Sequence, residues 1–158
     1  LRWVEKYTPV EIAQHYSEPL SKMIENSELT LLRVLHYPPV PQGQKVCRAS
    51  AHEDINLLTI LPAAAGAGLE IQDMNDQWVS VPPNPETVLI NIGDMLQEAS
   101  GGYYPSTTHQ VATPADQQAN FSRMSLPLFL HPRPDVKLSE RYTSKQYLQE
   151  RLKELGVI

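Results

Sequence analysis

The chain has 158 residues, of which 41% are hydrophobic and 20% are charged, a composition typical of one folded domain and not of a disordered segment. Thirteen Lys and Arg residues against eighteen Asp and Glu residues give a net charge of −5, which argues against nucleic-acid binding through phosphates. Fourteen prolines, several of them clustered, exclude a long all-helical protein and favour short strands.

Three further features bear on location and on completeness. Cys47 is the only cysteine, so an internal disulfide is excluded and we expect a cytoplasmic protein. No run reaches the roughly 18 apolar residues of a membrane helix, so we expect no membrane association. The chain begins at Leu1 and not at Met, and we expect it to be part of a longer protein.

The amino-terminal residues predict helix, from Pro9 to Glu28. Pro19 follows Ser17 and Glu18 as it would in a first helical turn, and Leu20 begins an apolar spacing typical of a helix. From Leu31 onward the period changes to that of strands.

Eight short strands separated by turn residues are predicted after this point. Asn75 and Asp76 predict a hairpin between two of them, and residues 93–100 predict a helical turn. Turns every 8 to 12 residues or so are typical of an antiparallel sandwich or barrel. The predicted strands are 31–37, 45–54, 56–61, 68–73, 77–81, 87–92, 107–113 and 121–130.

The carboxy-terminal residues predict one amphipathic helix packed on the β core. Thr143 to Gln146 fits a capping box, and Leu148, Leu152 and Leu155 follow at helical spacing.

His52-Glu53-Asp54 is the first segment with an obvious chemical use. In a strand, His52 and Asp54 point to the same face and can share a divalent cation. A second imidazole would complete a triad of two His and one carboxylate, which suits non-haem Fe(II). His109, on the predicted strand 107–113, is the candidate. A hydrogen-bonded structural histidine is the alternative interpretation of His52.

Arg123 and Ser125 share one face of an otherwise apolar predicted strand. An inward-facing arginine is costly unless it pairs with an anion, and its planar fork matches a carboxylate. The alternative interpretation is an arginine that faces solvent or pairs with an internal glutamate.

Read in order, His52-x-Asp54, His109 and Arg123-x-Ser125 resemble the Fe(II)- and 2-oxoglutarate-dependent oxygenases of the isopenicillin N synthase-like superfamily. The resemblance runs from about Leu31 to Pro132. The segments that resemble the family follow in the expected order: 35–39, 51–59, 68–71 with 78–79, 91–94 and 106–109.

The resemblance implies a mainly β fold, a double-stranded β-helix or jelly roll with flanking amino- and carboxy-terminal helices. Residues 31–135 would form the jelly-roll domain. Residues 1–30 would be the remnant of an amino-terminal helical region, and residues 136–158 a helix packed on the barrel.

The resemblance also implies site residues and cofactors. Arg123 and Ser125 would hold the distal carboxylate of 2-oxoglutarate, with Tyr37 as a further hydrogen-bond partner. No catalytic group is expected beyond the metal ligands, and substrate-binding residues and oligomeric state are not predicted. The Fe(II) ligands would be His52, Asp54 and His109.

The implied reaction couples oxidative decarboxylation of 2-oxoglutarate to hydroxylation, desaturation or cyclisation of a small organic substrate. Dioxygen is the oxidant, and ascorbate is a candidate reductant for the iron. Two alternatives stay open. One is an oxidase without 2-oxoglutarate, in which Arg123 holds the substrate's own carboxylate, and the other is a non-catalytic jelly-roll binding protein.

Overall fold

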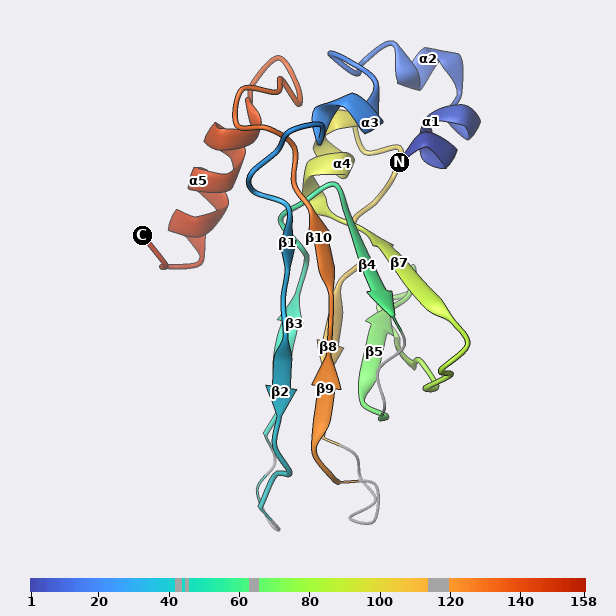
Figure 1. Cartoon of the computed structure of the whole chain (residues 1–158), viewed down its shortest axis with the longest axis vertical. Helices are drawn as coiled ribbons and strands as arrows, with labels where there is room; N and C mark the ends of the chain where they lie inside the picture. The colour runs from blue at the N-terminus through green and yellow to red at the C-terminus, as the bar shows by residue number, and fades with distance from the viewer. Residues whose placement is uncertain (42–43, 45, 63–65, 114–119) are drawn as a thin grey trace.

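The computed structural model describes residues 1–41, 44, 46–62, 66–113 and 120–158. The helices gather at one end of the long axis, and the strands run along it (Figure 1). The helices of this described part are α1 (Arg2–Tyr7), α2 (Val10–Ala13), α3 (Leu20–Met23), α4 (Asp94–Ala99) and α5 (Ser144–Glu154). Its strands are β1 (Leu31–Leu32), β2 (Leu35–Tyr37), β3 (Ala49–His52), β4 (Leu58–Pro62), β5 (Leu69–Gln72), β6 (Trp78–Ser80), β7 (Val88–Ile92), β8 (His109–Val111), β9 (Arg123–Ser125) and β10 (Leu128–Leu130).

Within the described residues, the strands form two four-stranded antiparallel sheets and one two-stranded ribbon. The β4 sheet has the order β1-β10-β4-β7, the β8 sheet has the order β3-β8-β5-β6, and β2 pairs with β9. Side chains from both sheets line one cavity, so the sheets face each other. Two facing sheets with this strand order form a jelly roll, which confirms the predicted fold class.

Two predicted strands are each divided, so ten strands stand in the described residues where eight were expected. The segment 31–37 is split into β1 and β2, and the segment 121–130 into β9 and β10. The halves continue in one line but pair in different sheets (Figure 1). Pro127, at the second break, has no N–H to donate, and its carbonyl accepts a bond from Arg33 N at 3.0 Å.

The hairpin of β5 and β6 is confirmed. Ile71 pairs with Val79, and Asp76 takes the positive φ of 59° that the turn requires. The Asp73 carboxylate accepts bonds from Asn75 N and Gln77 N, which closes the turn.

The predicted amino-terminal helix is broken into short pieces. Pro9 and Pro19 are the N-caps of α2 and α3, because a proline cannot continue a helix that precedes it. The helix α1 was not predicted. Leu20 and Met23 of α3 are fully buried, as their spacing indicated. No helix in the described part of the chain has the length and apolar character needed to cross a membrane.

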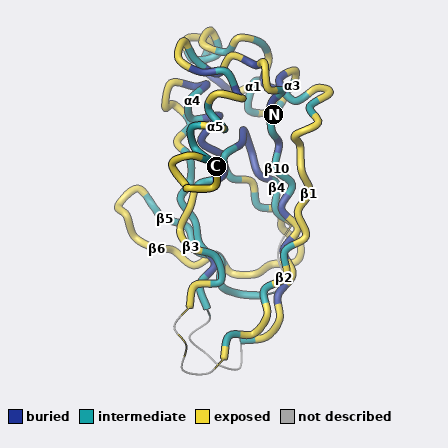
Figure 2. The backbone as a smooth tube through the Cα atoms, turned by 90° about the vertical axis from the view of Figure 1, so that its left-hand side faces the viewer, coloured by how far each residue is buried: buried dark blue, intermediate teal, exposed yellow. Residues whose placement is uncertain are grey.

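The hydrophobic core lies at the helical end of the barrel, where Figure 2 shows the buried residues gathered. Side chains of α3 and α4 meet there with the ends of β4 and β10. The other end of the barrel encloses the cavity. The buried apolar residues of this core are Leu20, Met23, Leu57, Leu58, Met95, Leu96, Ala99, Leu130, Val136 and Leu138.

The helix α5 begins at the predicted capping box. Gln146 N donates to Thr143 Oγ1 at 3.3 Å, and Thr143 N donates to Gln146 Oε1 at 2.9 Å. Leu148 packs against the core, but Leu155 lies past the last turn and is 61% exposed, so the predicted apolar stripe ends before it.

Contacts with α4 attach α5 to the rest of the fold. Arg151 Nε donates to Asp94 Oδ2 at 3.1 Å, and Asp94 is almost fully buried. Burial raises the pKa of Asp94 to about 7, against the opposing effect of Arg151. Between its ordinary pKa and about 7, Asp94 therefore keeps a proton in the folded state that the unfolded chain releases, and its contribution to stability falls as the pH rises.

Replacing Arg151 by Met should lower the free energy of unfolding by about 1–2 kcal/mol at about pH 8, because an ionised buried carboxylate loses its partner. At about pH 5 Asp94 is protonated in the folded state, so the loss should be smaller. Urea unfolding of the two proteins at both pH values measures this difference. Arg141→Met is the matched control, because its pair with Glu150 is exposed. An equal loss of unfolding free energy in both variants would contradict a stabilising role for the buried pair of Arg151 and Asp94.

Candidate metal centre

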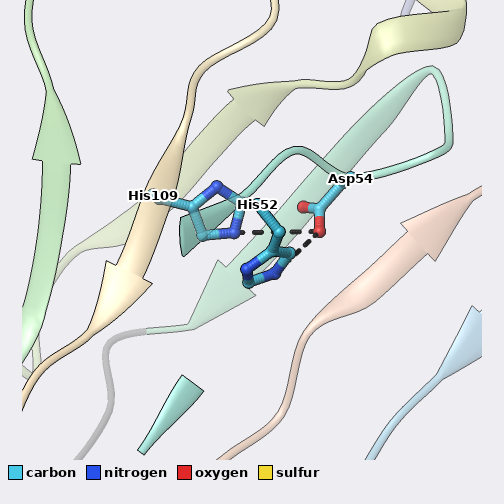
Figure 3. A group of neighbouring side chains, drawn as sticks. All are labelled: His52, Asp54 and His109. Carbon is cyan, nitrogen blue, oxygen red and sulfur yellow. Dashed lines mark ion pairs between the residues drawn. The ribbon is translucent and has the colours of Figure 1, made fainter. Parts of the chain in front are cut away.

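His52 and His109 lie opposite each other on neighbouring strands of the β8 sheet. The register of β3 and β8 pairs them directly, after a shift between Ala49 and His52. Their ring centroids are 4.4 Å apart, and Figure 3 shows both rings beside the carboxylate of Asp54. The pairing brings together two histidines that are far apart in the sequence.

Asp54 reaches the histidines by a route that differs from the predicted one. The strand β3 ends at His52, so Asp54 lies beyond it and not two residues along the same strand. Backbone contacts with the start of α4 hold it, since Asp94 N donates to Asp54 O at 2.9 Å. Its side chain is 6% exposed, and Oδ1 lies 3.8 Å from His52 Nε2 and 3.7 Å from His109 Nε2.

The same backbone interaction orients both imidazoles. His52 Nδ1 lies 2.7 Å from the carbonyl of Ser50, and His109 Nδ1 lies 2.9 Å from the carbonyl of Thr107. A carbonyl can only accept, so each Nδ1 carries the proton. In the neutral imidazole, Nε2 then presents a lone pair toward Asp54.

Three acceptor atoms therefore converge on one point. The ligand atoms of His52, Asp54 and His109 lie within 4.8 Å of one another, and the described residues contain no second group of this kind. Converging lone pairs without a donor between them are suited to a cation. Two imidazoles and one carboxylate are the donor set of facial-triad Fe(II) sites, so the residues fit the metal that the resemblance implies.

Arg123 and Ser125 face the interior, as their spacing predicted. Both are buried, whereas Met124 between them is exposed. Tyr37 pairs with Arg123 in the register of β2 and β9, and the guanidinium carbon lies 5.6 Å from the Tyr37 ring centroid. The three side chains that were predicted to hold a carboxylate thus form one group.

The guanidinium of Arg123 lacks a counter-ion among the described residues. Its Nε donates to Gly66 O at 3.1 Å, but its buried Nη1 has no hydrogen-bond partner in the described part of the chain. Burial lowers the pKa of Arg123, and the nearby Tyr37 acts in the opposite direction. A buried cation with an unpaired N–H is suited to an anionic ligand.

One cavity of about 260 Å³ connects the two groups. Its wall is otherwise largely apolar, with Leu61, Leu69 and Ile71 among the lining residues. An apolar wall combined with polar groups that converge on the cavity is typical of small-molecule sites. The polar or ionisable lining residues are Tyr37, His52, Asp54, Thr59, Asn91, Thr107, His109, Arg123 and Ser125.

Two residues near the cluster were not predicted as functional. Thr59 Oγ1 donates to Asp54 Oδ2 at 2.5 Å, and Asn91 Nδ2 donates to the same oxygen at 2.9 Å. The sequence could have indicated Asn91, because a polar amide is unusual within the otherwise apolar and β-branched strand 87–92.

The sequence profile of the 2OG-Fe(II) oxygenase superfamily matches residues 28–132. Over 149 residues, the chain is 35% identical to gibberellin 2-beta-dioxygenase 7 of Arabidopsis thaliana, a match that covers 89% of this chain and 42% of that protein.

Solved structures of similar proteins have the same fold. A candidate oxygenase from Shewanella oneidensis is 54% identical with a TM-score of 0.90, over 100% of this chain and 60% of that one. A full-length Neurospora crassa protein in complex with alpha-KG is 29% identical with a TM-score of 0.70, over 78% of this chain and 48% of that one. The chain thus spans less than two thirds of these relatives. Profile, fold and relatives agree, and the chain belongs to the 2OG-Fe(II) oxygenase superfamily.

Proposed function

We propose that this chain carries the iron- and 2-oxoglutarate-binding site of an oxygenase that oxidises a small organic substrate. One observation carries the proposal: a three-acceptor cluster and an unpaired buried guanidinium line the same cavity. In the proposed reaction, 2-oxoglutarate and dioxygen become succinate and carbon dioxide, and one oxygen atom enters the substrate in a hydroxylation.

His52, Asp54 and His109 would hold the metal. Iron, when bound, supplies the chelation of the keto acid and the activation of dioxygen. The carbonyls of Ser50 and Thr107 accept hydrogen bonds from the protonated Nδ1 atoms, so each Nε2 has a free lone pair for a metal.

Arg123 would bind the distal carboxylate of 2-oxoglutarate through the N–H groups that no described residue occupies. Ser125 lies two residues along the same face, and Tyr37 pairs beside the guanidinium. The apolar wall between this group and the cluster would keep water away from the keto acid. These residues would orient the cosubstrate with one end at the arginine and the other at the metal.

An oxidase that uses Arg123 for the carboxylate of its own substrate is the alternative. The relative from Neurospora crassa was crystallised with alpha-KG, which favours 2-oxoglutarate for this chain. The two functions differ in whether 2-oxoglutarate binds and is consumed.

We also propose the division of the chain that the resemblance implied. Residues 31–135 would form the catalytic jelly roll, since they contain all ten strands of the described part and the six proposed ligand residues. Residues 1–30 would belong to an amino-terminal helical region, and residues 136–158 would complete the domain with α5. A reducing, cytoplasmic location agrees with the single, exposed Cys47.

Replacing His109 or Asp54 by Ala should abolish saturable binding of Fe(II), because two ligands alone do not form the facial triad. Anaerobic isothermal titration of each variant with Fe(II) measures the loss, and the unchanged chain should bind one equivalent. His15→Ala is the matched control, since His15 is exposed and lies outside the cluster. Binding of one equivalent by either ligand variant with unchanged affinity would reject the assigned metal site.

Replacing Arg123 by Met should raise the Kd of 2-oxoglutarate by about 30-fold or more, because truncating one partner of a buried charge pair costs about 2–5 kcal/mol. Calorimetric titration of the Mn(II)-loaded chain with 2-oxoglutarate measures the Kd without turnover. Arg33→Met is the control, because Arg33 is exposed.

Succinate release from 2-oxoglutarate with Fe(II) and ascorbate is the matching activity measurement. If the unchanged chain neither binds 2-oxoglutarate nor releases succinate, the 2-oxoglutarate function is excluded and the oxidase is favoured.

A further inference from the structure

The two oxygens of the Asp54 carboxylate have different surroundings. Oδ1 faces His52 Nε2 and His109 Nε2 at 3.8 Å and 3.7 Å. Oδ2 faces the other sheet and accepts two hydrogen bonds, from Thr59 Oγ1 at 2.5 Å and from Asn91 Nδ2 at 2.9 Å. One oxygen is therefore occupied by donors of the protein, and the other is turned toward the two imidazoles.

We propose that Thr59 and Asn91 are positioning residues that make Asp54 a ligand through Oδ1 alone. The inference rests on the proposed metal site and assigns a role to two residues outside it. A carboxylate with both oxygens available can bind a metal through one or both of them. Two donors on Oδ2 hold it away from the imidazoles, which leaves one coordination position more for the cosubstrate and dioxygen.

The direction of the Thr59 hydrogen bond is determined by its neighbours. Asn56 Nδ2 lies 2.8 Å from Thr59 Oγ1, and an amide nitrogen can only donate. The Thr59 hydroxyl accepts that bond, so its single proton is directed to the carboxylate of Asp54. Asn56 and Thr59 are both buried, and a chain of this kind is stronger in a low dielectric than its separate bonds in water.

The register of the β4 sheet explains why both donors reach one oxygen. Thr59 of β4 and Asn91 of β7 are direct partners within five consecutive register pairs. Partners in an antiparallel sheet project to the same face, and both residues line the cavity. A slip of one residue would turn both side chains outward, so the pairing itself places the two donors.

Only a glycine fits at position 93, because the backbone of Asp54 and Asn56 packs directly against it. A Cβ at Gly93 would lie 2.2 Å from Asn56 Oδ1, 2.3 Å from Asn56 O and 2.8 Å from Asp54 O, all closer than real contacts. Its φ of −94° is open to any residue, so the requirement is room and not backbone conformation. Three residues of the segment 91–94 therefore contact Asp54. The Asn91 amide donates to its carboxylate, the Gly93 backbone packs closely against its carbonyl, and the Asp94 backbone N–H donates to that carbonyl.

Replacing Thr59 by Val or Asn91 by Leu should weaken binding of Co(II), a spectroscopic probe for the site, by about 10- to 100-fold. Anaerobic titration followed by the visible absorption of Co(II) gives both the Kd and the coordination. Release of Oδ2 should also change the intensity of the Co(II) bands, because intensity depends on the number of ligands. A purely structural role would lower the unfolding temperature and leave the spectrum of the bound metal unchanged.

Matched variants make the experiment specific. Thr59→Ser keeps the hydroxyl and should restore both affinity and spectrum, whereas Thr87→Val removes an exposed hydroxyl and should change neither. If Thr59→Val does not fold, Asn91→Leu tests the same oxygen from a half-buried position. Folded variants with unchanged Kd and spectrum would overturn the positioning role alone. Failure of the unchanged chain to bind Co(II) or Fe(II) would overturn the metal site as well.

Discussion

The carboxylate of Asp54 is the anion on which the two sheets of the barrel converge. Its Oδ2 is held by donors from β4 and β7, and its Oδ1 faces the histidines of β3 and β8. An ionised carboxylate that is almost fully buried is stable only with such partners. The donors on one side are supplied by the chain. On the other side three lone pairs meet, and this donor set is suited to a cation.

The rest of the molecule divides into a packed end and a hollow end, and Asp54 lies at their boundary. The apolar core joins α3 and α4 to the neighbouring strand ends, so the loop after β3 is held against a well-packed unit. Beyond it, the cavity extends to Arg123, which is buried beside the Tyr37 ring. His52 and His109 lie on strands, and Asp54 lies on a loop that the packed end of the molecule holds, so the cluster is more rigid than one built on unsupported loops.

The fold class and the capped carboxy-terminal helix were predicted correctly, the helix and the antiparallel strands from local spacing and the jelly roll from the family resemblance. The proposed ligand residues were predicted from the His-x-Asp and Arg-x-Ser spacings together with the resemblance, and Tyr37 from the resemblance alone. Arg123 and Ser125 face inward because β9 is a regular strand. For Asp54 the strand spacing was wrong, because this residue reaches His52 through a turn after β3 and not along it. Thr59 and Asn91 were missed because their roles depend on the register of β4 and β7. The divided strands were missed because β1 and β10 pair in the β4 sheet whereas β2 and β9 pair with each other, and local spacing does not specify that division.

The central claim is that one cavity binds a metal at the histidines and a dicarboxylate at the arginine. Anaerobic addition of 2-oxoglutarate to the Fe(II)-loaded chain tests both together, since chelation of iron by a keto acid produces a visible charge-transfer absorption. We expect a band that saturates at one equivalent of 2-oxoglutarate. Saturable Fe(II) binding without any such band, at concentrations of 2-oxoglutarate well above that of the chain, would contradict the claim.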